Sequence, residues 1–306
     1  MAKDARADAV KFQAFRTSEL IIENVGKAPY QTKTTSTTES QADMLRRLEL
    51  STNHYLLLKD YCEKKDIIFL ITPFDETSLK ELEEIGVSAY KIASTDTTNL
   101  PFLKKVAQTG KPIFLSTEMT YLDEIKEALK EIHPKNKKII LMQCTANYPI
   151  EDNEANSKIV KLFQQEFDCL IGYSDHSVGI GAAPYAIPMG VCMIEKHFTL
   201  DKSAKGPDHL ASLGPAELKA LFKEVKRIET YMGVVIKEPT KSELQTRKSL
   251  QKCLVAAKPI TKGSVIKESD LLGKRTGGVG ISPIEYKKIV ESVAVKDFDL
   301  NEIIVQ

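Results

Sequence analysis

The sequence predicts a parallel (β/α)8-type barrel that lacks its first strand, followed by a small β-rich module. From residue 8 to residue 198, short apolar runs alternate with polar loops and helical patterns, which is typical of a parallel sheet. The apolar runs are nearly continuous, as expected for strands that helices cover on both faces. After residue 250 the pattern changes to short alternating strands and turns.

Seven apolar runs are expected to form the barrel strands: residues 9–13, 67–72, 89–92, 113–116, 139–142, 170–174 and 191–194. Periodicity of 3.6 residues predicts helices over 78–85, 122–132 and 216–232, the first of them behind Asp75 or Thr77 as its cap. A standard barrel has eight strands, and residues 4–7 resemble the end of a helix. We therefore expect the chain to begin inside the first strand–helix unit.

Three segments follow from this pattern. Residues 1–236 are assigned to the barrel, 237–249 to a polar linker that contains Pro239, and 250–306 to the β-rich module. A module of about 57 residues is near the lower size limit for independent stability. We expect it to pack against a partner.

Composition excludes several classes of function. The 43 Lys and Arg residues balance 42 Asp and Glu residues, so no electrostatic footprint for nucleic acid or anionic membranes is present. No apolar run approaches the roughly 18 residues of a membrane span, and the opening MAKDARADAVKF lacks the apolar core of a signal peptide. A cytoplasmic enzyme is expected. The five scattered cysteines are predicted to be buried free thiols, and no Cys/His zinc cluster is evident.

Two histidines follow consecutive predicted strands, His176 in GYSDHS and His197 in IEKHFTLD. Imidazoles at adjacent strand ends converge, and imidazole with oxygen ligands suits Mn, Zn or Fe. One such histidine alone would more simply be a hydrogen-bonded structural residue, but the pair predicts a metal site. Neighbouring acids are expected to orient the pair: Asp175, Glu195 and Asp208. His209 could be a further ligand or a substrate contact.

Basic and hydroxylic residues also lie at predicted strand ends: Lys11, Thr72, Lys91, Ser94 and Ser116. A buried lysine is costly unless it is paired. Two lysines among hydroxyls form a receptor for a phosphate and a carboxylate. The alternative is a Schiff-base lysine, which would not need the two histidines.

The chain resembles the bacterial sialic acid synthases and their legionaminic and pseudaminic acid relatives. The motifs that carry the resemblance are VKFQ, ITPFDE, YKIAS, LSTEM, QCTANYP, GYSDHS, IEKHFTLDKSAKGPDHLASL and CLVAAKPITKGSVI with KRTGGVGISP. IEKHFTLDK followed by GPDHLASL is the most specific of these. The resemblance implies a TIM-type barrel and a C-terminal SAF (antifreeze-like, β-clip) domain, which reaches over the partner's barrel in a domain-swapped homodimer.

The resemblance also implies residue roles. His176 and His197 would hold Mn²⁺, with Mg²⁺ or Co²⁺ as alternatives. Phosphoenolpyruvate would be bound by Lys11, Thr72, Lys91, Ser94, Ser116 and Ser174. The sugar would be contacted by Gln13, Tyr148 and Asp208, and by Arg275 of the neighbouring subunit. Catalytic roles fall to Lys11, to Asp96 as an acid beside the sugar, and to Glu195 beside the second metal ligand.

The implied activity is that of an N-acetylneuraminate synthase-like transferase in carbohydrate biosynthesis. Phosphoenolpyruvate condenses with N-acetylmannosamine or a diacetamido-hexose to give a nonulosonic acid and phosphate. C3 of phosphoenolpyruvate attacks the sugar aldehyde, which the ion polarises as a Lewis acid. The oxocarbenium at C2 captures water, and phosphate leaves by C–O cleavage while the lysines offset its charge.

Three features depart from the family pattern. The opening AEIGxNHxG motif is absent, and with it a glutamate that acts near C2 of phosphoenolpyruvate. Glu118 stands where many relatives have the glycine of STGM, and Ala146 replaces a Ser or Asn, which removes a hydrogen bond worth about 0.5–1.5 kcal/mol. Two alternatives therefore stay open. One is another phosphoenolpyruvate-aldose synthase, which the SAF domain argues against, and the other is a catalytically impaired sugar-binding barrel.

Overall fold

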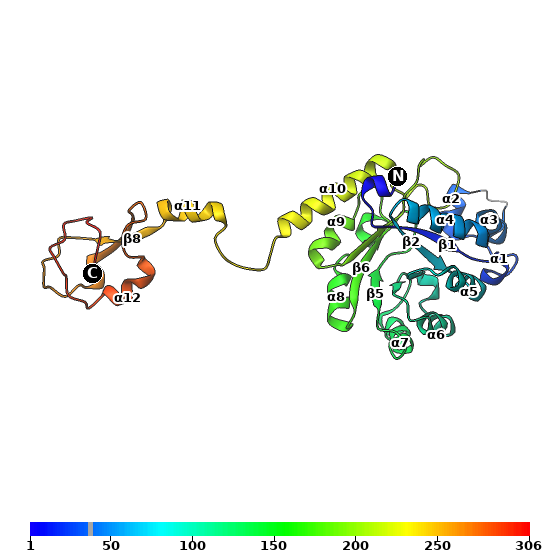
Figure 1. The fold of residues 1–306 in the computed structure, drawn as a ribbon, viewed down its shortest axis with the longest axis horizontal. Helices are drawn as coiled ribbons and strands as arrows, with labels where there is room; N and C mark the ends of the chain where they lie inside the picture. Colours follow the sequence, from blue (N-terminus) through cyan, green and yellow to red (C-terminus); the bar gives the residue numbers. More distant parts are fainter. Residues whose placement is uncertain (36–38) are drawn as a thin grey trace. The chain divides into compact units, whose positions relative to one another are not determined.

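The chain folds as two units, Met1–Gly233 and Val234–Gln306. The structure is a computed structural model that describes residues 1–35 and 39–306 (Figure 1). In the described part of the chain, no helix is long and apolar enough to cross a membrane.

The described residues of the first unit form seven parallel strands, as predicted. They are β1 (Ala9–Ala14), β2 (Ile68–Pro73), β3 (Tyr90–Ile92), β4 (Ile113–Ser116), β5 (Ile139–Gln143), β6 (Leu170–Asp175) and β7 (Met193–Lys196). One ladder joins β1 to β2, and another joins β3 to β7 in chain order. Among the described residues no ladder joins β2 to β3 or β7 to β1. The sheet is therefore a parallel half-barrel.

Helices surround these strands in Figure 1. They are α1 (Thr17–Leu20), α2 (Pro29–Thr34), α3 (Gln41–Leu48), α4 (Thr52–Lys64), α5 (Glu76–Ile85), α6 (Leu100–Gln108), α7 (Leu122–Ile132), α8 (Ile159–Glu166), α9 (Ala183–Ala186) and α10 (Pro215–Met232). The three predicted helices are confirmed in α5, α7 and α10. Asp75 caps α5, because its Oδ1 accepts a hydrogen bond from the Ser78 backbone at 2.6 Å. In α7, Ile125, Leu129 and Ile132 recur at helical spacing and are buried.

Burial differs between the central and the outer strands. The central strands are almost wholly buried, and β3 is buried at each of its three residues. In contrast, β7 is only partly buried throughout, and β1 has one fully buried residue, Ala14. A cavity of about 660 Å³ is lined by residues of both strands and by Leu218, Leu221 and Phe222 of α10. The expectation of strands covered on both faces therefore holds for the centre of the sheet and not for β1 and β7.

The second unit contains α11 (Lys241–Leu250), the antiparallel strands β8 (Lys252–Ala256) and β9 (Leu271–Arg275), and α12 (Tyr286–Ile289). Its own core includes Leu254, Ile260, Phe298 and Ile304. Most of the segment predicted as a linker is helix α11. This helix begins with a capping box. Thr240 Oγ1 accepts a hydrogen bond from the Glu243 backbone N–H at 3.3 Å, and Glu243 Oε2 accepts one from the Thr240 backbone N–H at 2.8 Å.

All five cysteines carry free thiols. Cys62, Cys144 and Cys253 are buried, as expected, but Cys192 is exposed and Cys169 is half-buried. The expectation of burial is wrong for these two because they lie at the start of strands, outside the apolar centre of the sheet. Each precedes its strand by one residue, β7 for Cys192 and β6 for Cys169.

Gly278 allows the Gly-rich loop to approach α11 closely. Its φ is +84°, and a Cβ added there would lie 2.5 Å from the backbone oxygen of Lys248. A left-handed backbone at a non-glycine residue costs about 1–2 kcal/mol. Gly278→Ala is expected to destabilise the second unit by more than this, because the clash adds to the strain. Gly277→Ala is the matched control, because φ is +71° and its Cβ would meet nothing within 4 Å. Hydrogen exchange of β8 and β9 measures the difference, and equal protection in both variants would contradict the clash.

Candidate active site

Two lysines and one glutamate from β1, β3 and β7 form a largely buried network, in which Lys91 is buried and the side chains of Lys11 and Glu195 are 21% and 11% exposed. Glu195 Oε1 accepts hydrogen bonds from Lys11 Nζ at 3.1 Å and Ser174 Oγ at 2.9 Å, and it lies 3.7 Å from Lys91 Nζ. Lys91 Nζ also donates to Ser116 Oγ at 2.6 Å. Ladder register explains one of these contacts, because Ser174 and Glu195 are direct partners between β6 and β7.

The network has one more cation than anion. Burial by itself would raise the pKa of Glu195, but Lys11 and Lys91 hold it well below its usual range. Burial lowers the pKa of Lys91, and Glu195 opposes that shift. Two ammonium groups sharing one carboxylate leave a buried positive charge without a counterion in the trio, which favours an anionic ligand.

The two predicted histidines lie next to each other. His176 and His197 follow the ladder partners Asp175 and Lys196, and their ring centroids are 5.2 Å apart. Burial lowers the pKa of His176 below its usual value and that of His197 further. Both imidazoles are therefore neutral at neutral pH, which is the form that binds metal ions.

The groups that orient these histidines differ in part from those predicted. His176 Nδ1 donates to the backbone oxygen of Thr145 at 2.9 Å, which leaves its Nε2 lone pair free. His197 Nδ1 lies 3.8 Å from Asp208 Oδ2, which brings the predicted acid beside the ring but is too far for a hydrogen bond. Burial raises the pKa of Asp208 to about 6.

Asp175 does not orient the histidines, and that expectation is wrong. Its Oδ2 accepts from Lys196 Nζ at 2.8 Å, and its Oδ1 accepts from Ser177. Successive residues of a strand point to opposite faces, so Asp175 and Lys196 face away from the side that Ser174 and Glu195 share. Glu195 is on the expected side, but it hydrogen-bonds Lys11 and Ser174 rather than an imidazole.

Tyr148 packs against both histidines. Its ring centroid lies 4.1 Å from that of His176 and 5.2 Å from that of His197. The Tyr148 hydroxyl donates to Glu118 Oε1 at 3.5 Å, and burial raises its pKa well above the usual value. This predicted sugar contact therefore lies directly beside the predicted metal ligands.

The other predicted residues are placed less closely together. Thr72 Oγ1 is buried and has no hydrogen-bond partner among the described residues. Ser94 Oγ accepts from the Glu118 backbone at 2.8 Å. Asp96 Oδ1 accepts from Asn99 Nδ2 at 2.9 Å within its own turn, and burial raises its pKa.

Among the described residues, three further predicted positions make no hydrogen bond to this network. Gln13, on β1, is exposed and lines the cavity together with Asp208 and His209. His209 Nδ1 is hydrogen-bonded to Thr199 Oγ1 at 2.8 Å. Arg275 is exposed on β9 of the second unit.

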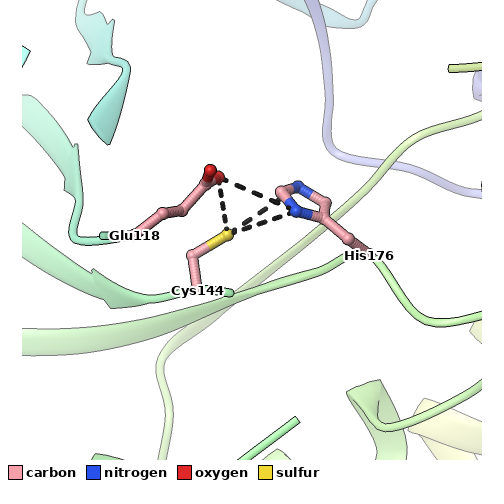
Figure 2. Close-up of side chains that lie close together, drawn as sticks. All are labelled: Glu118, Cys144 and His176. Carbon is pink, nitrogen blue, oxygen red and sulfur yellow. Dashed lines mark hydrogen bonds and ion pairs between the residues drawn. The ribbon is translucent and has the colours of Figure 1, made fainter. Parts of the chain in front are cut away.

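A cluster of Glu118, Cys144 and His176 was missed by the sequence prediction, which expected no Cys/His group (Figure 2). Cys144 Sγ lies 3.0 Å from Glu118 Oε1 and 3.6 and 3.7 Å from the two nitrogens of His176. Glu118 and Cys144 are each two residues beyond the ladder partners Ser116 and Met142. Their proximity thus depends on the register between β4 and β5, although each residue by itself follows a strand end.

These donors fit a divalent metal ion. His176 is neutral and oriented, and carboxylate and thiol groups face its ring. Carboxylate, imidazole and thiolate are all common ligands of divalent ions. His176 would hold the ion, because both the predicted pair and the observed cluster contain it.

Comparisons with known proteins identify the family of this chain. The model of the NeuB family matches residues 1–237. The chain is 43% identical to N,N'-diacetyllegionaminic acid synthase of Campylobacter jejuni, over 99% of this chain and 92% of that protein. It is 32% identical to N-acetylneuraminate-9-phosphate synthase of Homo sapiens, over 99% and 86%.

A solved structure is similar as well. The N-acetylneuraminic acid synthetase of Leptospira borgpetersenii, determined in complex with citrate, superposes with a TM-score of 0.72 at 35% identity, over 81% of this chain and 84% of that one. The matched regions include the strands that carry the lysines and the histidines, since the family match covers residues 1–237. The chain therefore belongs to the NeuB family, the family of the sialic acid synthases.

Proposed function

We propose that this enzyme condenses phosphoenolpyruvate with an N-acetylated amino sugar, N-acetylmannosamine or a diacetamido-hexose, to form a sialic-acid-type nonulosonic acid and phosphate. The observation that carries the proposal is the buried Lys11, Lys91 and Glu195 network beside two neutral histidines. Excess positive charge suits the phosphate and carboxylate of phosphoenolpyruvate, and the histidines suit a divalent ion.

Hydroxyl groups around the lysines support the proposed phosphoenolpyruvate site. Ser116 and Ser174 already hydrogen-bond members of the network. Thr72 Oγ1 is a buried donor with no partner in the described chain, and a bound phosphate or carboxylate oxygen would satisfy it. Ser94 is buried at the same strand ends.

The proposed reaction forms a bond between C3 of phosphoenolpyruvate and the aldehyde carbon of the sugar, adds water at C2 and breaks the C2–O bond to phosphate. His176 and His197 would hold a divalent ion, Mn²⁺ with Mg²⁺ or Co²⁺ as alternatives. This ion would polarise the aldehyde of the sugar. Lys11 and Lys91 would hold the phosphate and carboxylate throughout. Gln13, Tyr148 and Asp208 would orient the sugar, with Asp96 as an acid near it.

The proposed architecture is a TIM-type (β/α)8 barrel over residues 1–236, a linker over 237–249 and an SAF domain over 250–306. The cavity between β1 and β7 supports it, because both strands line a space where one further strand would close the barrel.

The enzyme is proposed to be cytoplasmic and to form a domain-swapped homodimer in which Arg275 reaches the neighbour's sugar site. A light-scattering mass of one chain would contradict the dimer.

The test of the proposed function is phosphate release from phosphoenolpyruvate with Mn²⁺ and a panel of N-acetyl hexosamines, with and without a chelator. We expect release that depends on both the sugar and the ion. With ¹⁸O in the bridging position, the label should appear in the phosphate, because the C–O bond breaks. Sugar binding without phosphate release would favour a catalytically impaired sugar-binding barrel. No phosphate release with any sugar would contradict the synthase.

Thr72→Val is expected to change stability and substrate binding in opposite directions. The apo protein should become about 1 kcal/mol more stable, because a buried hydroxyl without a partner is removed. Phosphoenolpyruvate should bind about 2- to 10-fold more weakly, since one hydrogen bond is lost. Urea denaturation and calorimetric titration measure the two effects.

Thr117→Val is the matched control for this prediction. Its Oγ1 is also buried but donates to the backbone oxygen of Met142 at 2.9 Å. This variant should lose stability rather than gain it, because an acceptor is left unpaired. A loss of stability in Thr72→Val would show that its hydroxyl has a partner in the apo protein.

A further inference from the structure

We infer that Glu118, Cys144 and His176 bind one divalent cation together, through a carboxylate, a thiolate and an imidazole. The three side chains come from the loops after β4, β5 and β6, and Figure 2 shows them converging on one point. The inference rests on the proposed function only in placing a divalent ion beside His176. It adds two protein ligands to that ion and names its chemical class.

The separations between the donor atoms match those around a tetrahedral ion. Metal–sulfur bonds of about 2.3 Å and metal–oxygen or metal–nitrogen bonds of about 2.0–2.1 Å place tetrahedral ligand atoms about 3.3–3.6 Å apart. Here Cys144 Sγ is 3.0 Å from Glu118 Oε1 and 3.7 Å from His176 Nε2. One ligand atom of each residue lies within 4.8 Å of the other two, and the His176 nitrogen that lies 3.7 Å from Glu118 Oε1 is Nδ1. Cys144 Sγ lies almost equally far from the two ring nitrogens, so the His176 ring would turn to bring Nε2 to an ion held by the carboxylate and the thiolate.

The surroundings hold the donors in place. His176 Nδ1 is committed to the Thr145 backbone oxygen, so Nε2 is the nitrogen that offers a lone pair. The Glu118 backbone N–H donates a hydrogen bond to Ser94 Oγ, and the Glu118 side chain is 12% exposed. The Tyr148 ring packs 4.1 Å from the His176 ring and shields the cluster.

The thiol of Cys144 and the carboxylate of Glu118 form a hydrogen bond, which bonds to an ion would replace. Cys144 Sγ donates its hydrogen to Glu118 Oε1 in the apo protein. On binding, a metal–sulfur bond forms, the S–H bond breaks and the proton leaves to solvent. The ring centroid of His197 lies 5.2 Å from that of His176, and among the described residues His197 is outside the cluster of three.

The donor set selects among ions. A thiolate is a soft ligand that favours Zn²⁺ and Co²⁺ and is a poor partner for Mg²⁺. Glu118 adds a carboxylate ligand that the pair of histidines does not supply. We therefore expect Zn²⁺ or Co²⁺ to bind more tightly than Mg²⁺.

The test uses the full chain, stripped of metal with a chelator and titrated with Co²⁺ alone. Ligation by Cys144 should produce a sulfur-to-cobalt charge-transfer band in the near ultraviolet. The band should be lost in Cys144→Ser and kept in Cys169→Ser, because Cys169 lies before the opposite, N-terminal end of β6. Absence of the band in the unaltered chain, or its survival in Cys144→Ser, would overturn the thiolate ligand.

Glu118 is tested by affinity. In calorimetric titration with Zn²⁺, Glu118→Gln should weaken binding by at least about 10-fold, the loss found even for groups that support a ligand indirectly. Glu127→Gln, on the exposed face of α7, should leave the affinity unchanged. Equal affinity in Glu118→Gln and the unaltered chain would overturn the carboxylate ligand.

These readouts do not need turnover. A chain that shows the cobalt band but releases no phosphate would keep the cation site and contradict the proposed function. A chain that releases phosphate without the band would keep the synthase and reject Cys144 as a ligand. Circular dichroism of each variant controls for folding. If Cys144→Ser does not fold, the presence or absence of the band in the unaltered chain decides whether a thiolate binds the ion.

Discussion

Glu195→Gln is expected to lower the free energy of unfolding by about 3–5 kcal/mol, the loss typical of removing one partner of a buried ion pair. Glu195 Oε1 is the carboxylate oxygen that Lys11 and Ser174 contact and that Lys91 approaches. With a neutral amide in its place, the buried ammonium group of Lys91 and the partly exposed one of Lys11 would face each other without an anion between them. Urea denaturation measures the loss.

The pH dependence of this effect has a definite sign. The two lysines hold the folded-state pKa of Glu195 well below its ordinary value, so its contribution is present above that ordinary value. The contribution is lost as pH falls through the folded-state pKa. The difference between the unaltered chain and Glu195→Gln should therefore be constant across neutral pH and shrink only in strong acid.

Two controls isolate the network. Glu127→Gln removes an exposed carboxylate of α7 and should cost less than about 1 kcal/mol. Combining Lys11→Met with Glu195→Gln should cost less than the sum of the single changes, because the second change removes an already unpaired charge. A loss below about 1 kcal/mol in Glu195→Gln would contradict a buried, tightly coupled network.

Lys91→Met is expected to reduce phosphate release by about 10²–10³-fold, the effect of removing one preorganised donor to a developing charge. Lys91 Nζ is buried at 3% exposure for the whole residue, so water cannot replace it, and it donates to Ser116 next to the proposed phosphate. The loss should appear in kcat and in the KM for phosphoenolpyruvate. A variant that turns over at the rate of the unaltered chain would exclude Lys91 from substrate binding.

Lys196→Met is the matched control for Lys91→Met. Its side chain is equally buried, but it pairs with Asp175 at 2.8 Å on the outward side of the strands. This variant should lose stability, because Asp175 is left unpaired, yet the folded fraction should keep its activity. Similar kinetic losses in both variants would indicate a general structural effect.

Much of the first unit was predictable from sequence, because local patterns decide strands and helices. Continuous apolar runs identified β1 to β7, and 3.6-residue periodicity identified α5, α7 and α10. Lys91 and Glu195 could be placed at strand ends for the same reason. Helix α11 was not foreseen, since its composition is polar and its stability comes from the Thr240 and Glu243 cap rather than from an apolar face.

The sequence by itself determined the order of strands and helices, the strand-end positions of the lysines and histidines, and the family. Tertiary structure alone decided which of these side chains meet. Glu118 and Cys144 are 26 residues apart and meet because the β4–β5 register aligns them, while Asp175 turns away because adjacent strand residues face opposite sides. Local patterns act over a few residues, whereas such contacts depend on how neighbouring strands are staggered, which only the folded sheet specifies.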